Sequence, residues 1–337
     1  MAKIKRLFND PYDIVEEMVE GYVGAHKQYV KMCDLDEAQG RVVLANDAGT
    51  KDKVGVIIGG GSGHEPLFIG YVGEDFADAV VIGNINTSPS PDPCYAAAKA
   101  CDNGKGCIYL YGNYAGDVMN FDMGAEKADE EDDIRVETVL VTDDVVSSEN
   151  IPDRRGIADF FVFKVAGAKA ATGADLDEVV AAAQKANDNT RSMGVAMSSA
   201  TLPAKGGTIF DMEDGDMEIG MGIHGEPGIR RGKIDTADNV IDEIMEPILK
   251  DLPYVEGDEV YVLVNSLGAT PLIDLHVCYR RVAQILEEKG IKVYKALVGP
   301  FACSMDMAGM SVTLMKLDDE LKELMDAPCD TPYFTQK

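Results

Sequence analysis

The chain has 337 residues, 46% of them hydrophobic, and a formal net charge of −28 at pH 7. This length allows a large core and favours two domains. Nucleic acids and anionic membrane surfaces are bound through positive charge, so a chain this acidic is not expected to bind either. No apolar run reaches the roughly 18 residues of a membrane helix and the N-terminus has no secretory signal, so a cytoplasmic protein is expected.

The seven cysteines show no C-x-x-C spacing. An odd number of cysteines in a chain of this size indicates reduced thiols. Neither a zinc site nor a disulfide framework is therefore predicted.

The first part of the chain alternates helical patterns with short apolar runs. Asp10 and Pro11 predict a helix start, and apolar residues from Ile14 to Val30 recur at helical spacing, with His26 on the same stripe in a structural role. Four runs predict buried strands of a largely parallel sheet, separated by helical segments such as 95–100 and 118–127: residues 54–58, 79–82, 107–111 and 136–141. Ligands of open α/β sheets bind beyond the carboxyl ends of the strands, so one functional edge is expected to hold residues 59–66, 84–91 and 113–117.

A second α/β set follows a helix that Asp175 caps and that ends near Asn187. The polar stretch 187–192 predicts the boundary between an N-terminal domain (1–188) and a C-terminal domain (189–337). The second domain is expected to hold strands at 194–198, 217–223, 259–264 and 292–297, and helices at 239–250, 271–289 and 318–325. His276 lies in the second of these helices and is predicted to be structural. The predicted fold class is thus two α/β domains, each with a central mostly parallel or mixed sheet flanked by helices.

Two of the four histidines lie in glycine-rich loops, His64 in Gly-Gly-Gly-Ser-Gly-His-Glu-Pro (59–66) and His224 in Gly-Ile-His-Gly-Glu-Pro-Gly (222–228). Neither loop matches a P-loop or a clear dinucleotide pattern, so no nucleotide cofactor is expected on this chain. A histidine and Asp117 on adjacent strand-end loops could share general-base work on a hydroxyl, while the second histidine attacks a carbonyl. That chemistry suits a small hydroxy-ketone. The alternative from the residues alone is that both histidines only brace turns.

Five segments together resemble the dihydroxyacetone kinase K subunit family: 59–66, Thr87-Ser88-Pro89, 113–117, 222–228 and 267–272. They occur in the family's order over nearly the whole chain. The resemblance implies that His224 binds the ketone carbon as a hemiaminal, and that His64 and Asp117 orient and deprotonate a terminal hydroxyl. It also implies that the substrate cavity is lined by Gly61, Ser62, Gly63, His64, Ser88 and Asp117. A covalent bond of this kind retains short ketoses and aldehydes and rejects glycerol, which has no electrophilic carbon.

The same resemblance implies partners. The chain is similar to the stand-alone subunit, which lacks the helical nucleotide-binding L domain, so ADP or ATP with Mg²⁺ is expected on a separate L-type subunit. An M-type phosphoprotein of the phosphotransferase system is a further expected partner, and a homodimer is implied. No cofactor and no metal are expected on this chain itself.

Two positions depart from the family pattern: Gly112 stands where many relatives carry lysine, and Asn86 where many carry an aromatic residue. Both changes alter bulk or polarity near the expected pocket, so L- or D-erythrulose is an alternative substrate. A second alternative is a coactivator of transcription that senses dihydroxyacetone without turnover. A third, a carbonyl-binding α/β protein without a kinase partner, fits the number of family motifs poorly.

Overall fold

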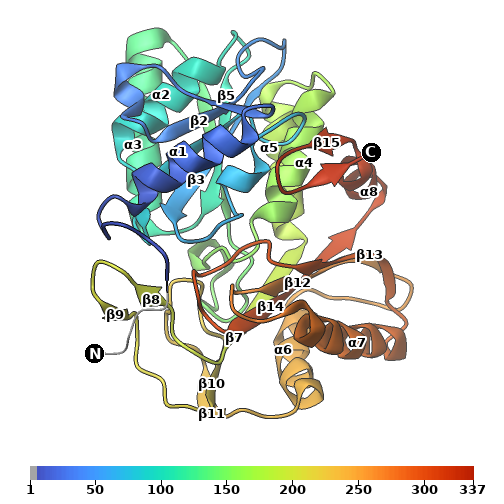
Figure 1. The fold of residues 1–337 in the computed structure, drawn as a ribbon. Coiled ribbons are helices and arrows are strands. Elements are labelled where there is room, and N and C mark those ends of the chain that lie inside the picture. The colour runs from blue at the N-terminus through green and yellow to red at the C-terminus, as the bar shows by residue number, and fades with distance from the viewer. Residues whose placement is uncertain (1–5) are drawn as a thin grey trace. The chain divides into compact units, whose positions relative to one another are not determined.

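The computed structural model describes residues 6–337, which form two compact units (Figure 1). The His64 unit comprises Leu7–Val141, Asp159–Asn187 and Leu321–Lys337, and the His224 unit comprises Arg6, Thr142–Ala158 and Asp188–Glu320. This division differs from a single cut after residue 188. Backbone hydrogen bonds explain why segments from each half of the chain belong to the other unit. The amide of Val145 donates to Ser192 O (3.1 Å) in the His224 unit, and two backbone bonds join Glu74 and Asp330 (2.9 and 3.0 Å) in the His64 unit.

The His64 unit is built on a six-stranded sheet of order β1-β2-β4-β3-β5-β6. Strands β4, β3, β5 and β6 are parallel, whereas β1 and β2 pair antiparallel at one edge. The strands are β1 (Val30–Met32), β2 (Val42–Ala45), β3 (Gly55–Ser62), β4 (Ala79–Ile85), β5 (Cys107–Gly112) and β6 (Val136–Val141), with a short pair β15 (Cys329–Asp330) and β16 (Thr335–Gln336). The helices are α1 (Ile14–His26), α2 (Pro91–Cys101), α3 (Ala115–Asp132), α4 (Phe160–Ala171) and α5 (Leu176–Asp188).

Aromatic packing fixes helix α3 on strand β5. The ring of Phe121 stacks on Tyr111 (centroids 4.3 Å apart) and meets the edge of Tyr109 (5.1 Å). All three side chains are fully buried. Because such pairs stabilise beyond the area they bury, they hold the N-terminal part of α3 against β5.

The His224 unit is built on a mixed sheet of order β11-β10-β7-β14-β12-β13, in which only β12 and β13 are parallel. Helix α6 buries Ile241, Ile244, Met245 and Ile248, one face of a helix by their spacing. The strands are β7 (Thr190–Ala196), β10 (Asp216–Ile219), β11 (Arg230–Lys233), β12 (Glu259–Ser266), β13 (Lys292–Gly299) and β14 (Gly309–Leu317), with a hairpin of β8 (Thr201–Leu202) and β9 (Gly207–Thr208). The helices are α6 (Ala237–Asp251) and α7 (Leu272–Glu288). Helix α8 (Asp319–Asp326) begins in this unit but belongs to the His64 unit from Leu321 on.

A buried charge cluster ties segment 142–158 to the sheet of the His224 unit. Asp251, at the end of α6, accepts hydrogen bonds from Arg154 (2.6 and 2.8 Å) and from Arg191 of β7. Both arginines are at most 5% exposed. Hydrogen bonds from Arg154 are the main reason that the pKa of Asp251 lies below its usual value.

The predicted fold class is confirmed, and the structure corrects several boundaries. Helix α1 begins at Ile14 because the Asp10 carboxylate accepts from the Tyr12 amide in a preceding turn (2.9 Å), and Val30 lies in β1 instead of the helix. Strand β3 continues through the glycines to Ser62. Among the described residues, no helix is long and apolar enough to cross a membrane.

Candidate functional site

Three of the predicted loops follow neighbouring parallel strands. The order β4-β3-β5, with Gly60 opposite Ile82 and Ile58 opposite Leu110, brings the carboxyl ends of these strands to the same sheet edge. His64 follows β3, Ser88 follows β4 and Asp117 follows β5. This edge is where open α/β sheets bind ligands.

His64 is held in a tightly bonded loop. Its side chain is buried and its ring meets the edge of Phe68 with the centroids 6.5 Å apart. Just before it, Ser62 Oγ donates to Gly83 O (2.7 Å), and the Gly63 amide donates to the Glu65 carboxylate (3.1 Å to each oxygen). The loop is therefore braced by its own side chains, which limits the positions that the imidazole can take.

Gly61 allows the end of β3 to lie directly against the loop after β4. A Cβ at Gly61 would be 2.8 Å from the Thr87 nitrogen, closer than real Cβ contacts. The neighbouring Asn86 has a left-handed backbone (φ 52°), and its amide donates to Ser62 O (3.0 Å). Asparagine tolerates this conformation better than most residues, so Asn86 has a backbone role that the sequence interpretation, which concerned substrate size, did not include.

Asp117 lies in the first turn of α3 and is 9% exposed. An acidic side chain in the first turn stabilises a helix through the helix dipole, so Asp117 suits this position. One turn further, Asn120 Nδ2 donates to Pro89 O (2.7 Å) and to Ser88 Oγ (3.3 Å). The same helix thus carries the predicted base and holds the Ser88 loop.

His224 lies in the loop between β10 and β11, where its partner is Glu226. The His224 amide donates to Glu226 Oε2 (3.0 Å), and His224 Nδ1 is 3.4 Å from Glu226 Oε1. Arg155 Nη1 lies 3.1 Å from the same Oε1. Burial by itself would raise the pKa of Glu226, but hydrogen bonding and charge from His224, together with Arg155, outweigh it and lower that pKa to about 2.

Sequence reasoning did not assign roles to Glu226 and Arg155. The sequence does contain a signal for Glu226. It lies two residues after His224 in a short loop, so its carboxylate has to lie close to the histidine. Arg155 had no such signal, because it is about 70 residues away in the chain and is brought close only by the pairing of segment 142–158 with β7.

The predicted site residues fall into two groups. Six of them belong to the His64 unit and to its carboxyl edge: Gly61, Ser62, Gly63, His64, Ser88 and Asp117. His224 belongs to the other unit, with Glu226 and Arg155 as its partners. Of the two histidine side chains, His64 is buried, whereas His224 is 24% exposed and open to a small molecule.

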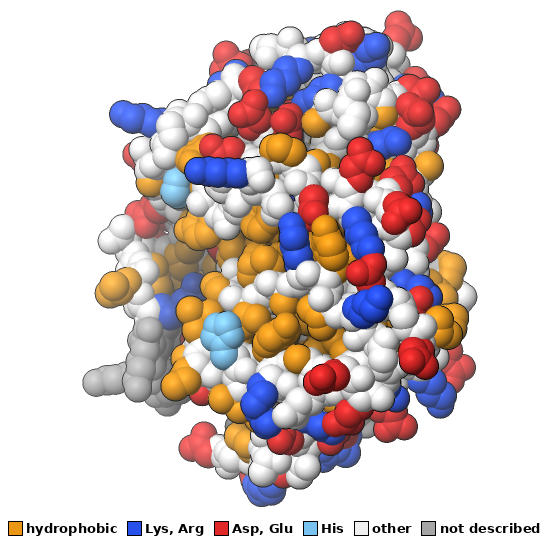
Figure 2. All heavy atoms as spheres, turned by 90° about the vertical axis from the view of Figure 1, so that its right-hand side faces the viewer, with side chains coloured by type: hydrophobic (Ala, Val, Ile, Leu, Met, Phe, Trp, Pro, Cys, Tyr) orange, Lys and Arg blue, Asp and Glu red, His pale blue; other side chains and the backbone are white. Residues whose placement is uncertain are grey.

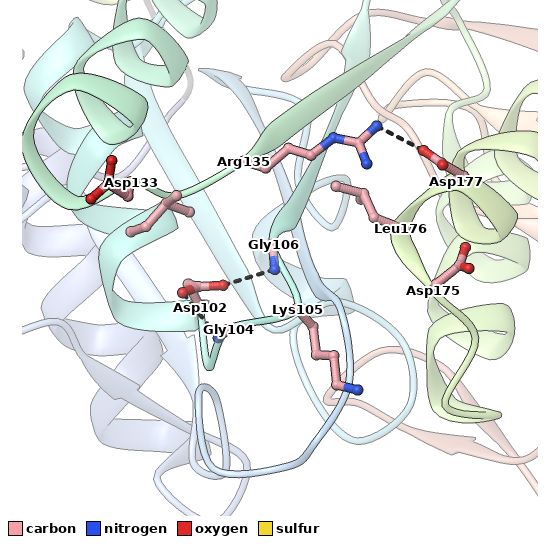
Figure 3. Close-up of a pocket in the computed structure, with 10 residues that line it drawn as sticks. Asp102, Gly104, Lys105, Gly106, Asp133, Arg135, Asp175, Leu176 and Asp177 are labelled. Carbon is pink, nitrogen blue, oxygen red and sulfur yellow. Dashed lines mark hydrogen bonds and ion pairs between the residues drawn. The ribbon is translucent and has the colours of Figure 1, made fainter.

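Clusters of metal-binding side chains, continuous basic areas and hollows would mark other sites on the remaining described surface. Within residues 6–337 no group of three or more His, Cys, Asp or Glu side chains is placed to hold a metal ion. Figure 2 shows acidic and basic side chains interspersed over the visible face, without one continuous basic area. A hollow of about 360 Å³ lies at the amino ends of β5 and β6, opposite to the edge with His64, and contains none of the predicted site residues (Figure 3).

Comparison with known proteins identifies the family. The Dak1 domain model matches residues 20–333. The chain is 60% identical to the dihydroxyacetone-binding subunit DhaK of the PTS-dependent dihydroxyacetone kinase 2 of Listeria innocua, over 98% of this chain and 99% of that protein. It is 42% identical to the L-erythrulose 1-kinase of Mycolicibacterium smegmatis, over 97% of this chain and 57% of that protein.

A solved structure agrees with these relatives. The dihydroxyacetone kinase from C. freundii, in complex with AMP-PNP and Mg²⁺, superposes with a TM-score of 0.87 at 31% identity, covering 98% of this chain and 61% of that one. The fold and the candidate site define an α/β protein with two mixed sheets, whose strand-end loops carry two histidines and an aspartate. Within that class, the chain belongs to the Dak1 domain family.

Proposed function

We propose that this chain is the ketose-binding catalytic subunit of a dihydroxyacetone-type kinase, a phosphotransferase with an alcohol group as acceptor. The observation that carries the proposal is the 60% identity to a dihydroxyacetone-binding subunit over nearly the full length of both proteins. The 42% identity to an erythrulose kinase makes a four-carbon ketose the second candidate substrate.

His224 is the proposed covalent tether. Its imidazole forms an N–C bond to the ketone carbon while the carbonyl π pair moves to oxygen, which takes up a proton. The product is a hemiaminal, and the bond is reversible. The His224 side chain is partly exposed, which allows a three-carbon ketone to reach the ring. Glycerol has no electrophilic carbon for the ring to attack.

His64 and Asp117 are the proposed acid–base pair for the terminal hydroxyl. As the hydroxyl loses its proton to this pair, its oxygen attacks the terminal phosphorus of the donor and the donor's phosphate bond breaks. Gly61, Ser62, Gly63 and Ser88 are proposed to line the substrate position.

The proposed donor is a nucleotide with Mg²⁺ on an L-type partner subunit, recharged by a phosphoprotein of the phosphotransferase system. Support comes from relatives named as subunits of PTS-dependent or PEP-dependent kinases. A homodimer is also proposed.

Phosphorylation of a ketose panel tests the proposal. The full chain, mixed with an L-type protein and a phosphoryl donor (ATP with Mg²⁺ or a phosphoenolpyruvate-driven phosphotransferase system), is given dihydroxyacetone, L-erythrulose, D-erythrulose and glycerol. Phosphorylation of dihydroxyacetone and none of glycerol is expected. If no ketose is phosphorylated while the ketone adduct still forms, the sensor alternative replaces the kinase.

Replacement of Asp117 separates binding from catalysis. Asp117→Asn is expected to keep the ketone adduct and to lose roughly 100-fold or more in phosphoryl transfer, the usual contribution of a general base. Asp122→Asn, an exposed aspartate on the same helix, is the matched control and is expected to have wild-type activity. Equal activity of Asp117→Asn and wild type would exclude Asp117 as the base.

A further inference from the structure

The loop that carries His224 places a carboxylate against one particular nitrogen of the ring. Glu226 Oε1 is 3.4 Å from His224 Nδ1, and Oε2 accepts the His224 amide at 3.0 Å. The loop is closed by backbone bonds from Gly222 N to Glu226 O (3.1 Å) and from Gly225 N to Gly222 O (3.0 Å). Both oxygens of Glu226 are thus engaged by the residue that the proposed function makes the nucleophile.

Arg155 holds the carboxylate from the other side. Its Nη1 is 3.1 Å from Oε1, the same oxygen that approaches the ring. The side chains of Arg155 and Glu226 are 28% and 23% exposed, so solvent only partly screens this pair. The low pKa of Glu226 is consistent with a carboxylate that stays ionised throughout the neutral range.

Gly222 leaves room for the Glu226 carboxylate beside the loop backbone. A Cβ at Gly222 would lie 2.2 Å from Glu226 Oε2 and 2.9 Å from its Cδ. Only glycine allows the carboxylate to lie against the backbone here. The first glycine of the loop is therefore explained by the position of Glu226.

Three donors surround the Glu226 carboxylate: the Arg155 guanidinium, the His224 amide and, when it carries a proton, His224 Nδ1. A carboxylate has only acceptor sites, so it favours the imidazole tautomer with hydrogen on Nδ1. In that tautomer the lone pair is on Nε2.

We infer that Glu226, held by Arg155, is a positioning residue that fixes the Nδ1–H tautomer of His224 and so presents Nε2 as the nucleophile. The inference rests on the proposed function for the identity of the electrophile. As Nε2 forms the bond to carbon, positive charge develops on the ring opposite the carboxylate. The Nδ1 proton then leaves to solvent as the former carbonyl oxygen takes up a proton from solvent, so that the neutral hemiaminal forms without net change in protons.

Glu226→Gln is the decisive variant. An amide has one acceptor atom and one donor group, so it cannot accept from all of the donors around it. Histidine-selective ¹⁵N labelling of the full chain, with long-range ¹H–¹⁵N spectra at pH 8 and assignment through His224→Ala, reports the tautomer without any ketone. The Nδ1–H form is expected to dominate in wild type, and the Nε2–H form is expected to increase at least several-fold in Glu226→Gln.

Adduct formation with dihydroxyacetone provides the second readout. Loss of a hydrogen bond to a charged group predicts a roughly 10- to 100-fold lower rate of adduct formation in Glu226→Gln and Glu226→Ala. Glu226→Asp, which keeps the charge, is expected to recover part of the rate. Glu243→Gln, which removes an exposed ion pair with Arg230 in the same unit, is the matched control and should leave tautomer and rate unchanged. Circular dichroism verifies that each variant is folded.

The outcomes distinguish the two proposals. If Glu226→Gln keeps wild-type tautomer populations and an adduct rate within twofold of wild type, the positioning role is wrong. If wild type shows the Nδ1–H tautomer but forms no adduct with any ketose, the proposed function fails while the tautomer assignment stands.

Discussion

The Asp144 carboxyl provides a quantitative test of the electrostatics around the His224 loop. Asp144 is 2% exposed, its side chain accepts from the Val146 amide (3.2 Å), and Asp143, Arg155 and Glu226 are the charged groups that act on it. Burial is the main cause that raises its pKa to about 7, and the negative charges of Asp143 and Glu226 add to it, against the opposing effect of Arg155 and the backbone bond.

The sign of the stability effect follows from proton binding. Between pH 4 and 7 the folded chain binds a proton at Asp144 that the unfolded chain has lost, so stability falls as pH rises through this window and stays low above it. A rise in the pKa of Asp144 from 3.8 to about 7 lowers the free energy of unfolding by about 4 kcal/mol over the whole titration. Roughly 3 kcal/mol of this loss develops between pH 5 and 8.

Asp144→Asn removes this titration and keeps an oxygen for the Val146 amide. Urea unfolding of the full chain, followed by circular dichroism at pH 5, 6, 7 and 8, is expected to show that the variant gains up to roughly 3 kcal/mol relative to wild type as pH rises. Asp214→Asn, an exposed aspartate in the same unit, is the matched control and should show no such trend. A pH-independent difference between Asp144→Asn and wild type would refute the argument.

Two further substitutions test other parts of the His224 unit. Asp251→Ala leaves its two arginine partners buried without a carboxylate and is expected to lower the free energy of unfolding by about 3–5 kcal/mol in urea titrations; a loss below 1 kcal/mol would show that water replaces the carboxylate. Gly222→Ala places a methyl group on the Glu226 carboxylate and is expected to slow ketone adduct formation by roughly 10- to 100-fold, measured by mass spectrometry. Gly207→Ala, where a Cβ meets no atom within 4 Å, should form the adduct at the wild-type rate, and an equal rate in Gly222→Ala would contradict the close approach.

The sequence predicted the fold best where burial gave a regular pattern. The four short apolar runs of the first domain are strands β3, β4, β5 and β6, and both α6 and α7 begin and end within two residues of their predicted bounds. Helix α4 was not predicted, because ten of its twelve residues, including Lys164, are buried and the helix therefore has no polar face to reveal its period. Strand β14 was not predicted either, since Ser311 and Thr313 interrupt its apolar run although both are fully buried.

The sequence alone suggests candidate site residues, whereas it does not reveal the contacts that hold them in place. Histidine in a glycine-rich loop is visible in a single sequence, as is an aspartate just after a strand. The contacts of Arg155 with Glu226 and of Asn120 with the Ser88 loop join segments that are far apart in the chain, so only the fold reveals them. Asn86 is the opposite case. The sequence marks it as a departure from the family pattern, but only the structure shows that it has a left-handed backbone, which asparagine tolerates better than most residues.

The covalent role of His224 is the central claim, and intact-protein mass spectrometry tests it most directly. After incubation of the full chain with dihydroxyacetone, wild type and His276→Ala are expected to gain the mass of one ketone, and His224→Ala is expected to gain none. His276 is an exposed histidine of α7 in the same unit, which makes it the matched control. An adduct that persists in His224→Ala would contradict the account.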